Sequence, residues 1–217
     1  MVPVERKYLV EQDVLMASGY ISDVLPGKGR VIGAPTERSM FGKGDVAYIE
    51  TDAPAKAGDR FYVLRNLGKV RHPETREMMG YLIEITGITE VVGKEGEHTK
   101  ARMETSFSEV MTGDILGDYY EMEEPFVTDV PRTLNVGGYI VATKQRRVIN
   151  THYDIVFIDR GRRDGVEVGD IIGTISRSKY EIPNGTIQVI ATKERTSTAV
   201  VRKIEKEVTV GDKIGSL

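Results

Sequence analysis

The sequence predicts an all-β protein made of two tandem copies of one small β-barrel or sandwich module, with little helix. Three observations predict this fold: short motifs recur in the same order in the two halves, Gly-Asp turns precede apolar strands, and long helical patterns are lacking. The chain has 217 residues, of which 23 are glycine, and 40% are hydrophobic. That composition fits a globular protein with a buried core and many turns.

The internal duplication rests on six matched segments. Six matches that keep their order favour a true duplication over the chance recurrence of turns and apolar strands. Where the spacing between the copies changes, the sequence is rich in Gly, Pro or charge, as in surface loops that accept insertions. The matches are 18–21 with 137–140, 30–33 with 147–150, 46–50 with 155–159, 57–64 with 168–175, 80–85 with 185–190, and 112–117 with 210–215.

This alignment divides the chain into four parts. An N-terminal arm, expected to be partly extended, precedes the first module, and an acidic, aromatic linker separates it from the second. We expect the linker aromatics to pack against a module, because a purely solvated linker would carry fewer of them. The first module has the longer loops, around Pro35 and Pro73, where a function that the second copy lacks is expected. The four parts are 1–17, 18–117, 118–136 and 137–217.

Two kinds of turn are predicted. Pro183-Asn184-Gly185 indicates a hairpin turn, because Asn-Gly readily adopts positive φ angles, and this turn explains the sequence better than a glycosylation site does. A Gly-Asp pair before a strand indicates a turn in which the aspartate side chain caps the backbone. Segment 105–111 is predicted as strand by analogy with 197–204. The predicted capping residues are Asp45, Asp59, Asp114, Asp170 and Asp212.

Composition excludes several classes of function. The chain has no cysteine, which excludes disulfides, cysteine nucleophiles and cysteine zinc sites. Its formal charge of -3 gives no general attraction to nucleic acid or anionic membrane. No apolar run approaches the roughly 20 residues that a membrane helix needs. The first residues lack a signal-peptide pattern, so we expect either a cytoplasmic protein or a chain whose leader has been removed.

The motifs associated with catalysis or cofactor binding are incomplete in this sequence. The glycine-rich segment 27–33 is one residue too long for a dinucleotide fingerprint, and 42–44 lacks the hydroxyl residue of a phosphate loop. His72, His98 and His152 have no partner at metal-ligand spacing. No nucleophile elbow or distinct carboxylate pair occurs. The sequence therefore predicts a protein that is not an enzyme and needs neither a metal nor a cofactor.

A few exposed basic residues remain as candidate binding residues. Arginine clusters on a small barrel can bind phosphates, but no aromatic residues for base stacking are interleaved with them. Solvated turns are therefore favoured over a nucleic-acid site, and nucleic acid is not the expected partner. The candidates are His72, Arg146, Arg147, Arg160, Arg162 and Arg163.

One loop carries a resemblance to known proteins. The order of Gly-Asp turn, apolar strand and the loop Arg71-His72-Pro73-Glu74-Thr75-Arg76-Glu77 resembles the C-terminal region of bacterial cell-envelope proteins that begin with a LysM domain. It is also similar to the C-terminal module of the flagellar assembly protein T family. Arg76 stands where that loop usually has glycine, which leaves its turn geometry open. The resemblance covers most of 18–117 and, more faintly, 137–215.

This resemblance implies a location and a role. It implies a signal peptide and a peptidoglycan-binding LysM domain upstream, and work in the periplasm or at the outer membrane; the cytoplasm is the alternative. The expected function is a non-catalytic envelope scaffold or assembly module that binds envelope proteins, or itself, through strand edges or loops. Two alternatives stay open: a nucleic-acid-binding small-barrel protein, and an envelope hydrolase that acts on polysaccharide.

Overall fold

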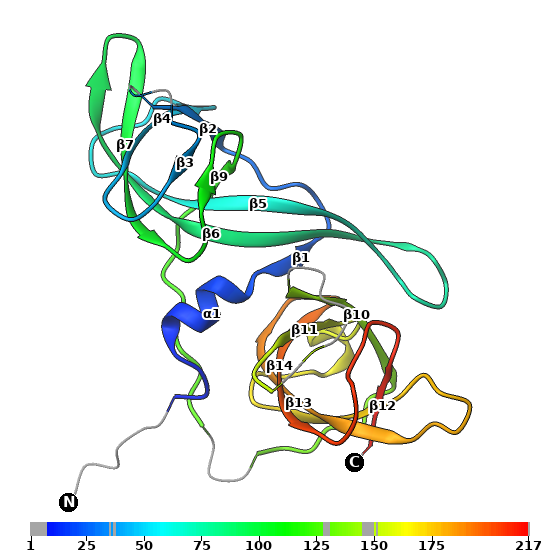
Figure 1. The fold of residues 1–217 in the computed structure, drawn as a ribbon. Coiled ribbons are helices and arrows are strands. Elements are labelled where there is room, and N and C mark those ends of the chain that lie inside the picture. The colour runs from blue at the N-terminus through cyan, green and yellow to red at the C-terminus, as the bar shows by residue number, and fades with distance from the viewer. Residues whose placement is uncertain are drawn as a thin grey trace, which may run out of the picture. The chain divides into compact units, whose positions relative to one another are not determined.

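The fold consists of two closed six-stranded β-barrels (Figure 1), which confirms the predicted all-β class and tandem modules. The computed structural model describes residues 8–34, 36, 38–127, 131–144, 150 and 152–216. Each barrel encloses an apolar core of its own. The cores include Val31, Ile49, Val63, Met103 and Leu116 in the first barrel, and Ile140, Val156, Ile172, Ile187 and Val201 in the second.

The first barrel closes through pairing of β6 with β7. Its ring runs β2-β4-β7-β6-β5-β9, and β1 (Tyr20–Ser22) adds to β6 outside the ring. A separate two-stranded sheet pairs β3 (Met40–Phe41) with β8 (Val110–Met111). The ring strands are β2 (Gly29–Gly33), β4 (Val46–Thr51), β5 (Arg60–Arg71), β6 (Met78–Glu95), β7 (His98–Ser106) and β9 (Ile115–Asp118).

The second barrel repeats the strand order of the first. Its ring runs β10-β11-β14-β13-β12-β15, so both rings place their strands, numbered along the chain, in the order first, second, fifth, fourth, third, sixth. The same unusual order in both halves supports the duplication. The strands are β10 (Gly138–Thr143), β11 (Ile155–Ile158), β12 (Ile171–Ile175), β13 (Pro183–Thr192), β14 (Ser197–Ile204) and β15 (Lys213–Gly215).

The predicted matches can be tested against this equivalence. Matches 46–50/155–159, 57–64/168–175 and 112–117/210–215 fall on equivalent strands. Match 80–85/185–190 joins the equivalent strands β6 and β13 in a shifted register, because Val91 and Val189 make the equivalent bonds to the preceding turns. The match 18–21/137–140 is wrong, since β1 lies outside the ring and β10 is equivalent to β2. Match 30–33/147–150 lies mostly outside the described residues.

The predicted aspartate caps are confirmed. At the turn before β5, Lys56 N donates to Asp59 Oδ2 over 2.8 Å, while Gly58 takes a φ of 93° that favours glycine. Gly58 N then donates to Val91 O on the neighbouring strand β6, and Val91 N donates to Asp59 O, at 2.9 and 2.8 Å. The other four aspartates, Asp45, Asp114, Asp170 and Asp212, cap the backbone N–H of Gly42, Met111, Glu167 and Thr209 in the same way.

Two of the predicted local structures differ from the observed ones. Pro183-Asn184-Gly185 is not a turn but the start of β13, and the hairpin turn lies at 176–182, closed by Ser176 N donating to Ile182 O. Asn184 is fully buried and donates to Asp212 Oδ2 and Glu207 O, so tertiary hydrogen bonds override its turn preference. In segment 105–111, β7 ends at Ser106 and β8 begins at Val110, with a bend between them.

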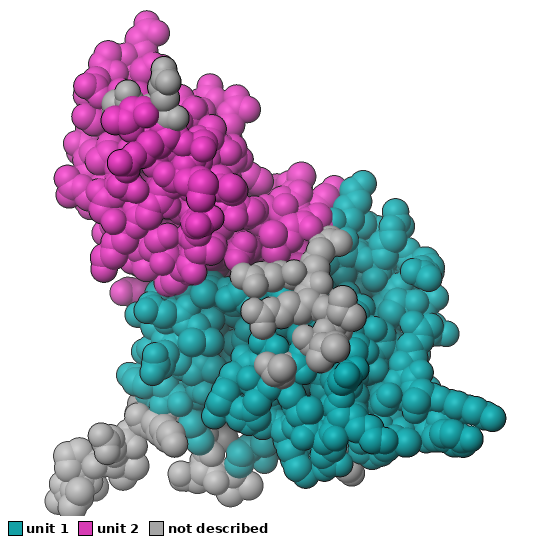
Figure 2. Space-filling view, in the orientation of Figure 1, with its two compact units in different colours: residues 1–21, 69–80, 123–217 teal, residues 22–68, 81–122 magenta. Residues whose placement is uncertain are grey.

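The chain separates into two compact units, coloured in Figure 2. One comprises 22–68 and 81–122 and holds the first barrel. The other comprises 1–21, 69–80 and 123–217 and holds the second barrel with the helix α1 (Gln12–Ser18). Residues 69–80, placed by sequence in the first module, thus belong to the unit of the second barrel.

The linker aromatics pack as predicted. The rings of Tyr119 and Tyr120 lie 5.1 and 5.4 Å from the ring of Tyr62 on β5, whose hydroxyl donates to Tyr120 O. Further along, Phe126 stacks on Tyr8 with ring centroids 5.0 Å apart, and the two residues form a β-bridge. The N-terminal arm and the linker are therefore tied together in an extended pairing.

Candidate functional site

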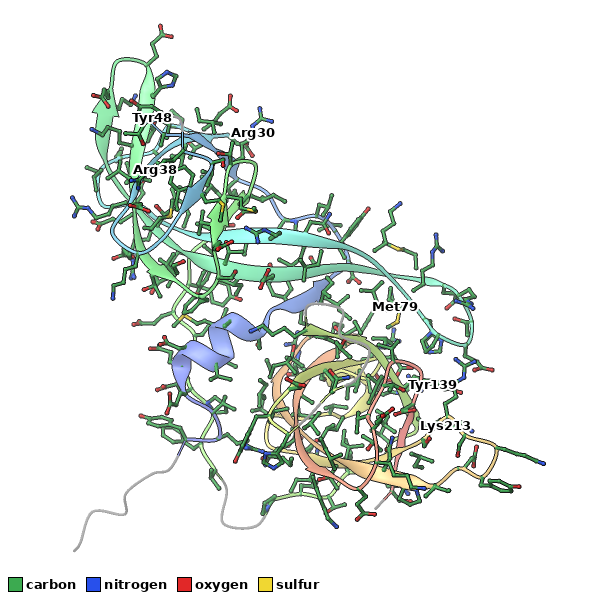
Figure 3. The ribbon with its side chains drawn as sticks, viewed as in Figure 1. Arg30, Arg38, Tyr48, Met79, Tyr139 and Lys213 are labelled. Carbon is green, nitrogen blue, oxygen red and sulfur yellow. The ribbon has the colours of Figure 1, made fainter. Side chains whose placement is uncertain are left out.

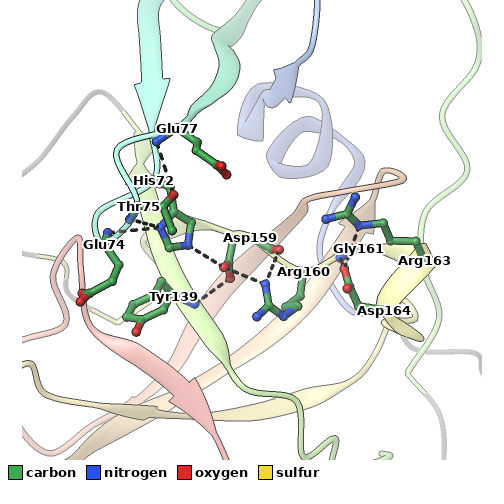
Figure 4. A network of polar contacts seen from close by, with 10 residues as sticks. All are labelled: His72, Glu74, Thr75, Glu77, Tyr139, Asp159, Arg160, Gly161, Arg163 and Asp164. Atoms are coloured by element: carbon green, nitrogen blue, oxygen red, sulfur yellow. Dashed lines mark hydrogen bonds and ion pairs between the residues drawn. The ribbon is translucent and has the colours of Figure 1, made fainter.

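A network of polar contacts surrounds His72, in the turn between β5 and β6 (Figure 4). His72 N donates to Glu77 O over 2.9 Å, and Arg76 N donates to His72 O over 3.0 Å. Arg76 adopts a φ of 64°, in the left-handed region that glycine favours. The turn thus keeps a glycine-like geometry with arginine in place, at a conformational cost.

Hydrogen bonds to both ring nitrogens fix the His72 imidazole. Nδ1 accepts from the backbone N–H groups of Glu74 and Thr75, at 3.2 and 3.1 Å, so in the neutral ring the proton is on Nε2. Nε2 lies 3.0 Å from Asp159 Oδ2 and donates to it. The ring also meets the edge of Tyr139, with centroids 5.1 Å apart. Neither nitrogen has a lone pair left for a metal or for proton transfer.

Asp159 is the centre of this network. It follows β11, is 4% exposed, and accepts from Tyr139 N through Oδ1 over 2.7 Å. Its Oδ2 accepts from Arg160 Nη1 over 2.8 Å as well as from His72. The arginine balances the buried carboxylate, and the hydrogen bonds join the hairpin turn to β10 and β11. We call this group, His72, Tyr139, Asp159 and Arg160, the latch.

The latch has the His–Asp pair of a catalytic triad but not its chemistry. In the part of the chain that the structure describes, no Ser, Thr or Lys side chain hydrogen-bonds to the His72 ring. A general base needs a free acceptor within reach of the nucleophile, and here the acceptor nitrogen is occupied by two amides. The latch is therefore a device for holding structure.

The three candidate arginines that the structure describes, Arg160, Arg162 and Arg163, each make contacts within the protein. Arg160 belongs to the latch, whereas Arg162 and Arg163 lie in the 3-10 helix η2 (Arg162–Asp164). Arg162 donates to Thr192 O and lies 3.8 Å from Glu194, and Arg163 lies 3.7 Å from Asp164. Each arginine thus has an acidic partner, which reduces the attraction for a polyanion. The remaining predicted pair, Arg146 and Arg147, lies outside the described residues.

Two ion pairs with buried carboxylates were not found from sequence. Arg65 binds Asp114 through Nε and Nη2, at 3.0 and 2.7 Å, and Arg132 binds Asp170 likewise, at 2.6 and 2.7 Å. Hydrogen bonding to Asp114 raises the pKa of Arg65 above its ordinary value. The two residues of each pair are 49 and 38 positions apart in the sequence, so no local sequence pattern predicts either ion pair. Both pairs brace Gly-Asp turns, which is a structural role.

One pocket of about 300 Å³ lies in the unit of the first barrel. Its size is at the lower end for small-molecule sites. Asp45 is its sole lining carboxylate among the described residues, and that carboxylate already accepts from Gly42 N and from Arg38. Among the described lining residues, Asp45 therefore has no second carboxylate beside it of the kind that paired-carboxylate hydrolysis of a polysaccharide uses. Its lining consists of Thr36, Arg38, Phe41, Asp45, Val46 and Lys100.

Apolar side chains are exposed on the short strands β3 and β8 and at a hairpin turn. Met40 and Met111 are paired across β3 and β8, at 44% and 39% exposure. Tyr180 in the turn at 176–182 is 74% exposed, next to Glu181, whose φ of 45° is unusual for a residue other than glycine. Methionine and tyrosine are enriched where proteins bind one another.

Comparisons with known proteins add no identity: no family model matches the chain, and a search of curated proteins finds no match. Within the described ranges, no cluster of three or more acidic or histidine side chains is arranged to hold a metal ion. No helix there is long and apolar enough to span a bilayer.

Proposed function

We propose that this protein is a non-catalytic scaffold or assembly module of the bacterial cell envelope, which binds protein partners through its loops. The proposal rests on one observation, which is that the histidine and aspartate side chains of the described network and turns are engaged in structural hydrogen bonds. The side chains best suited to acid–base chemistry already hold turns and strands in place. They are His72, Asp114, Asp159, Asp170 and Asp212.

Loops rather than strand edges provide the binding surface. Closing a barrel removes the open edges that bind a partner strand, and both rings are closed. Exposed apolar residues remain as anchors at the turns and on the short strands β3 and β8, which lie between ring strands of the first barrel. They are Met40, Met111, Val168, Tyr180 and Val210.

The resemblance of the 71–81 loop to envelope proteins supports a place in the periplasm or at the outer membrane. The observed left-handed φ of Arg76 fits that resemblance, because it is the conformation that the usual glycine would adopt. Peptidoglycan binding, on this proposal, belongs to an upstream LysM domain.

Affinity capture tests the proposal. Immobilised wild-type protein and the variants Met111→Ser and Tyr180→Ser would be incubated with envelope and cytosolic extracts of the source organism. Val24→Ser, a change at a side chain 70% exposed in a different loop, is the matched control. We expect envelope proteins to be retained by the wild type and the control, and to be lost with Met111→Ser or Tyr180→Ser. Recovery of cytosolic ribonucleoproteins alone, or release of sugars from purified cell wall, would contradict the proposal.

A further inference from the structure

The two barrels have equivalent hairpins, but the turn of the first hairpin packs against other strands and the turn of the second projects from its barrel. β5–β6 in the first barrel is equivalent to β12–β13 in the second. The first hairpin turn is fixed against β10 and β11 by the latch. The second turn, at 176–182, projects from its barrel in Figure 1 and carries Tyr180, the most exposed large apolar side chain among the described residues.

The surface that receives the first turn has an equivalent on the first barrel. Ile140 N donates to Asp212 O as Val31 N donates to Asp114 O, so Tyr139 and Arg30 occupy equivalent positions. Asp159 bonds opposite Tyr139 in the strand pair, and Glu50 stands opposite Arg30.

Glycines at matching positions support this equivalence. Gly138 precedes Tyr139 and Gly29 precedes Arg30, and neither site has space for a Cβ. A Cβ at Gly138 would lie 2.4 Å from the Asp159 side chain, and one at Gly29 would lie 2.0 Å from the Glu50 backbone oxygen.

The two surfaces differ in what covers them. Asp159 is 4% exposed beneath the hairpin turn. The side chains of Arg30 (Figure 3) and Glu50, which form an ion pair with atoms 2.8 Å apart, are 64% and 58% exposed. The chain therefore has an exposed turn at 176–182, which is equivalent to the turn that carries His72. It also has an exposed surface at Arg30 and Glu50, which is equivalent to the surface that receives that turn.

We propose that the turn at 176–182 of one copy docks on the Arg30–Glu50 surface of a second copy, head to tail. Tyr180 supplies the apolar anchor, and Lys179 supplies a positive charge for Glu50. This proposal rests on the proposed scaffold function and names its partner as a second copy of the chain. Contacts between two different surfaces produce closed rings or open filaments.

The turn is already ordered for such a contact. The turn follows the short strand β12, which has 5 residues where β5 has 12, and hydrogen bonds tie both of its ends to neighbouring segments. Arg177 N donates to Asp212 Oδ1, and Glu181 pairs with Lys213 of β15. A turn that is held in advance loses little conformational freedom on docking. The left-handed backbone of Glu181 is the kind of strain that accumulates at binding sites.

Sedimentation velocity of the full chain, from micromolar to near-millimolar concentration, tests the proposal. We expect the mass of the wild type to rise with concentration, whereas Tyr180→Ser and Glu50→Arg each stay monomeric. Tyr153→Ser, which removes another exposed tyrosine in the same unit, is expected to associate like the wild type. Because the contact joins different surfaces, mixing Tyr180→Ser with Glu50→Arg restores one intact turn and one intact surface, and yields a species of two chains.

Three results would overturn the proposal: a monomeric wild type at every concentration, association that both variants leave intact, or a mixture of the two variants that stays monomeric. A monomeric wild type that still captures envelope proteins from extract would reject self-docking and keep the scaffold function, so the two failures are distinguishable.

Discussion

His72 and Asp159, 87 residues apart in the chain, share a hydrogen bond of 3.0 Å that ties a hairpin turn of the first copy to the barrel of the second. Asp159 is almost fully buried, and the imidazole that reaches it is held by two backbone amides. The loop around Pro73, where sequence indicated a function absent from the second copy, thus serves to join strands of different origin.

Replacing His72 should loosen this joint. His72→Ala leaves the Asp159 carboxylate and the Glu74 and Thr75 amides short of a partner, so we expect a loss of about 1–3 kcal/mol in the free energy of unfolding. Urea unfolding measures the loss, and hydrogen exchange at Tyr139 N reports the latch directly. His98→Ala is the control, because His98 is exposed on β7. Equal stability of the two variants, with unchanged exchange at Tyr139, would count against the latch.

The buried and exposed ion pairs should differ in their effect on stability. Arg65→Met leaves Asp114, which is 6% exposed, without its bidentate partner, and we expect a cost of about 3–5 kcal/mol. Arg30→Met removes an exposed pair and should cost less than about 1 kcal/mol. The shift of the urea midpoint at a constant slope measures both. A cost for Arg65→Met no larger than that of Arg30→Met would contradict a bracing role.

Alkaline pH should destabilise the protein through Tyr62. Burial raises the pKa of Tyr62, and the neighbouring Tyr120 and Tyr119 raise it further. A raised pKa in the folded state means that the unfolded chain ionises first, so stability is complete below a pH of about 10 and declines as pH rises above it. Urea unfolding across this range measures the decline. We expect Tyr62→Phe to flatten it and Tyr153→Phe, at an exposed ring, to leave it unchanged; an equal slope in all three proteins would refute the assignment.

Local signals predicted the turns well and the tertiary contacts poorly. A Gly-Asp pair contains its own cap, since Asp59 bonds a backbone amide three residues away, and this information is present in the sequence. Asn184 looked equally local, yet its amide binds acceptors 23 and 28 residues away and forms part of a strand. The same limit applies to the latch: His72 was recognisable as a loop residue, but its partner is set by how two barrels with matching strand orders are connected.

Tyr153 occupies the position that is glycine in the Gly-Asp turns. A side chain with a Cβ at this position should lower the stability of the protein, because the backbone there is left-handed. Tyr153 N and Asp154 O bond Val201 just as Gly44 N and Asp45 O bond Met103, and Tyr153 has a φ of 69° where Gly44 has 88°. We expect Tyr153→Gly to be more stable than Tyr153→Ala by about 1 kcal/mol, because both lose the ring and only alanine keeps the Cβ that strains this conformation. Gly44→Ala, where a Cβ has open space around it, should lose a similar amount for the same reason. Thermal and urea unfolding of the three variants decide the matter, and equal stability of the glycine and alanine variants at 153 would show that the turn relaxes instead of storing strain.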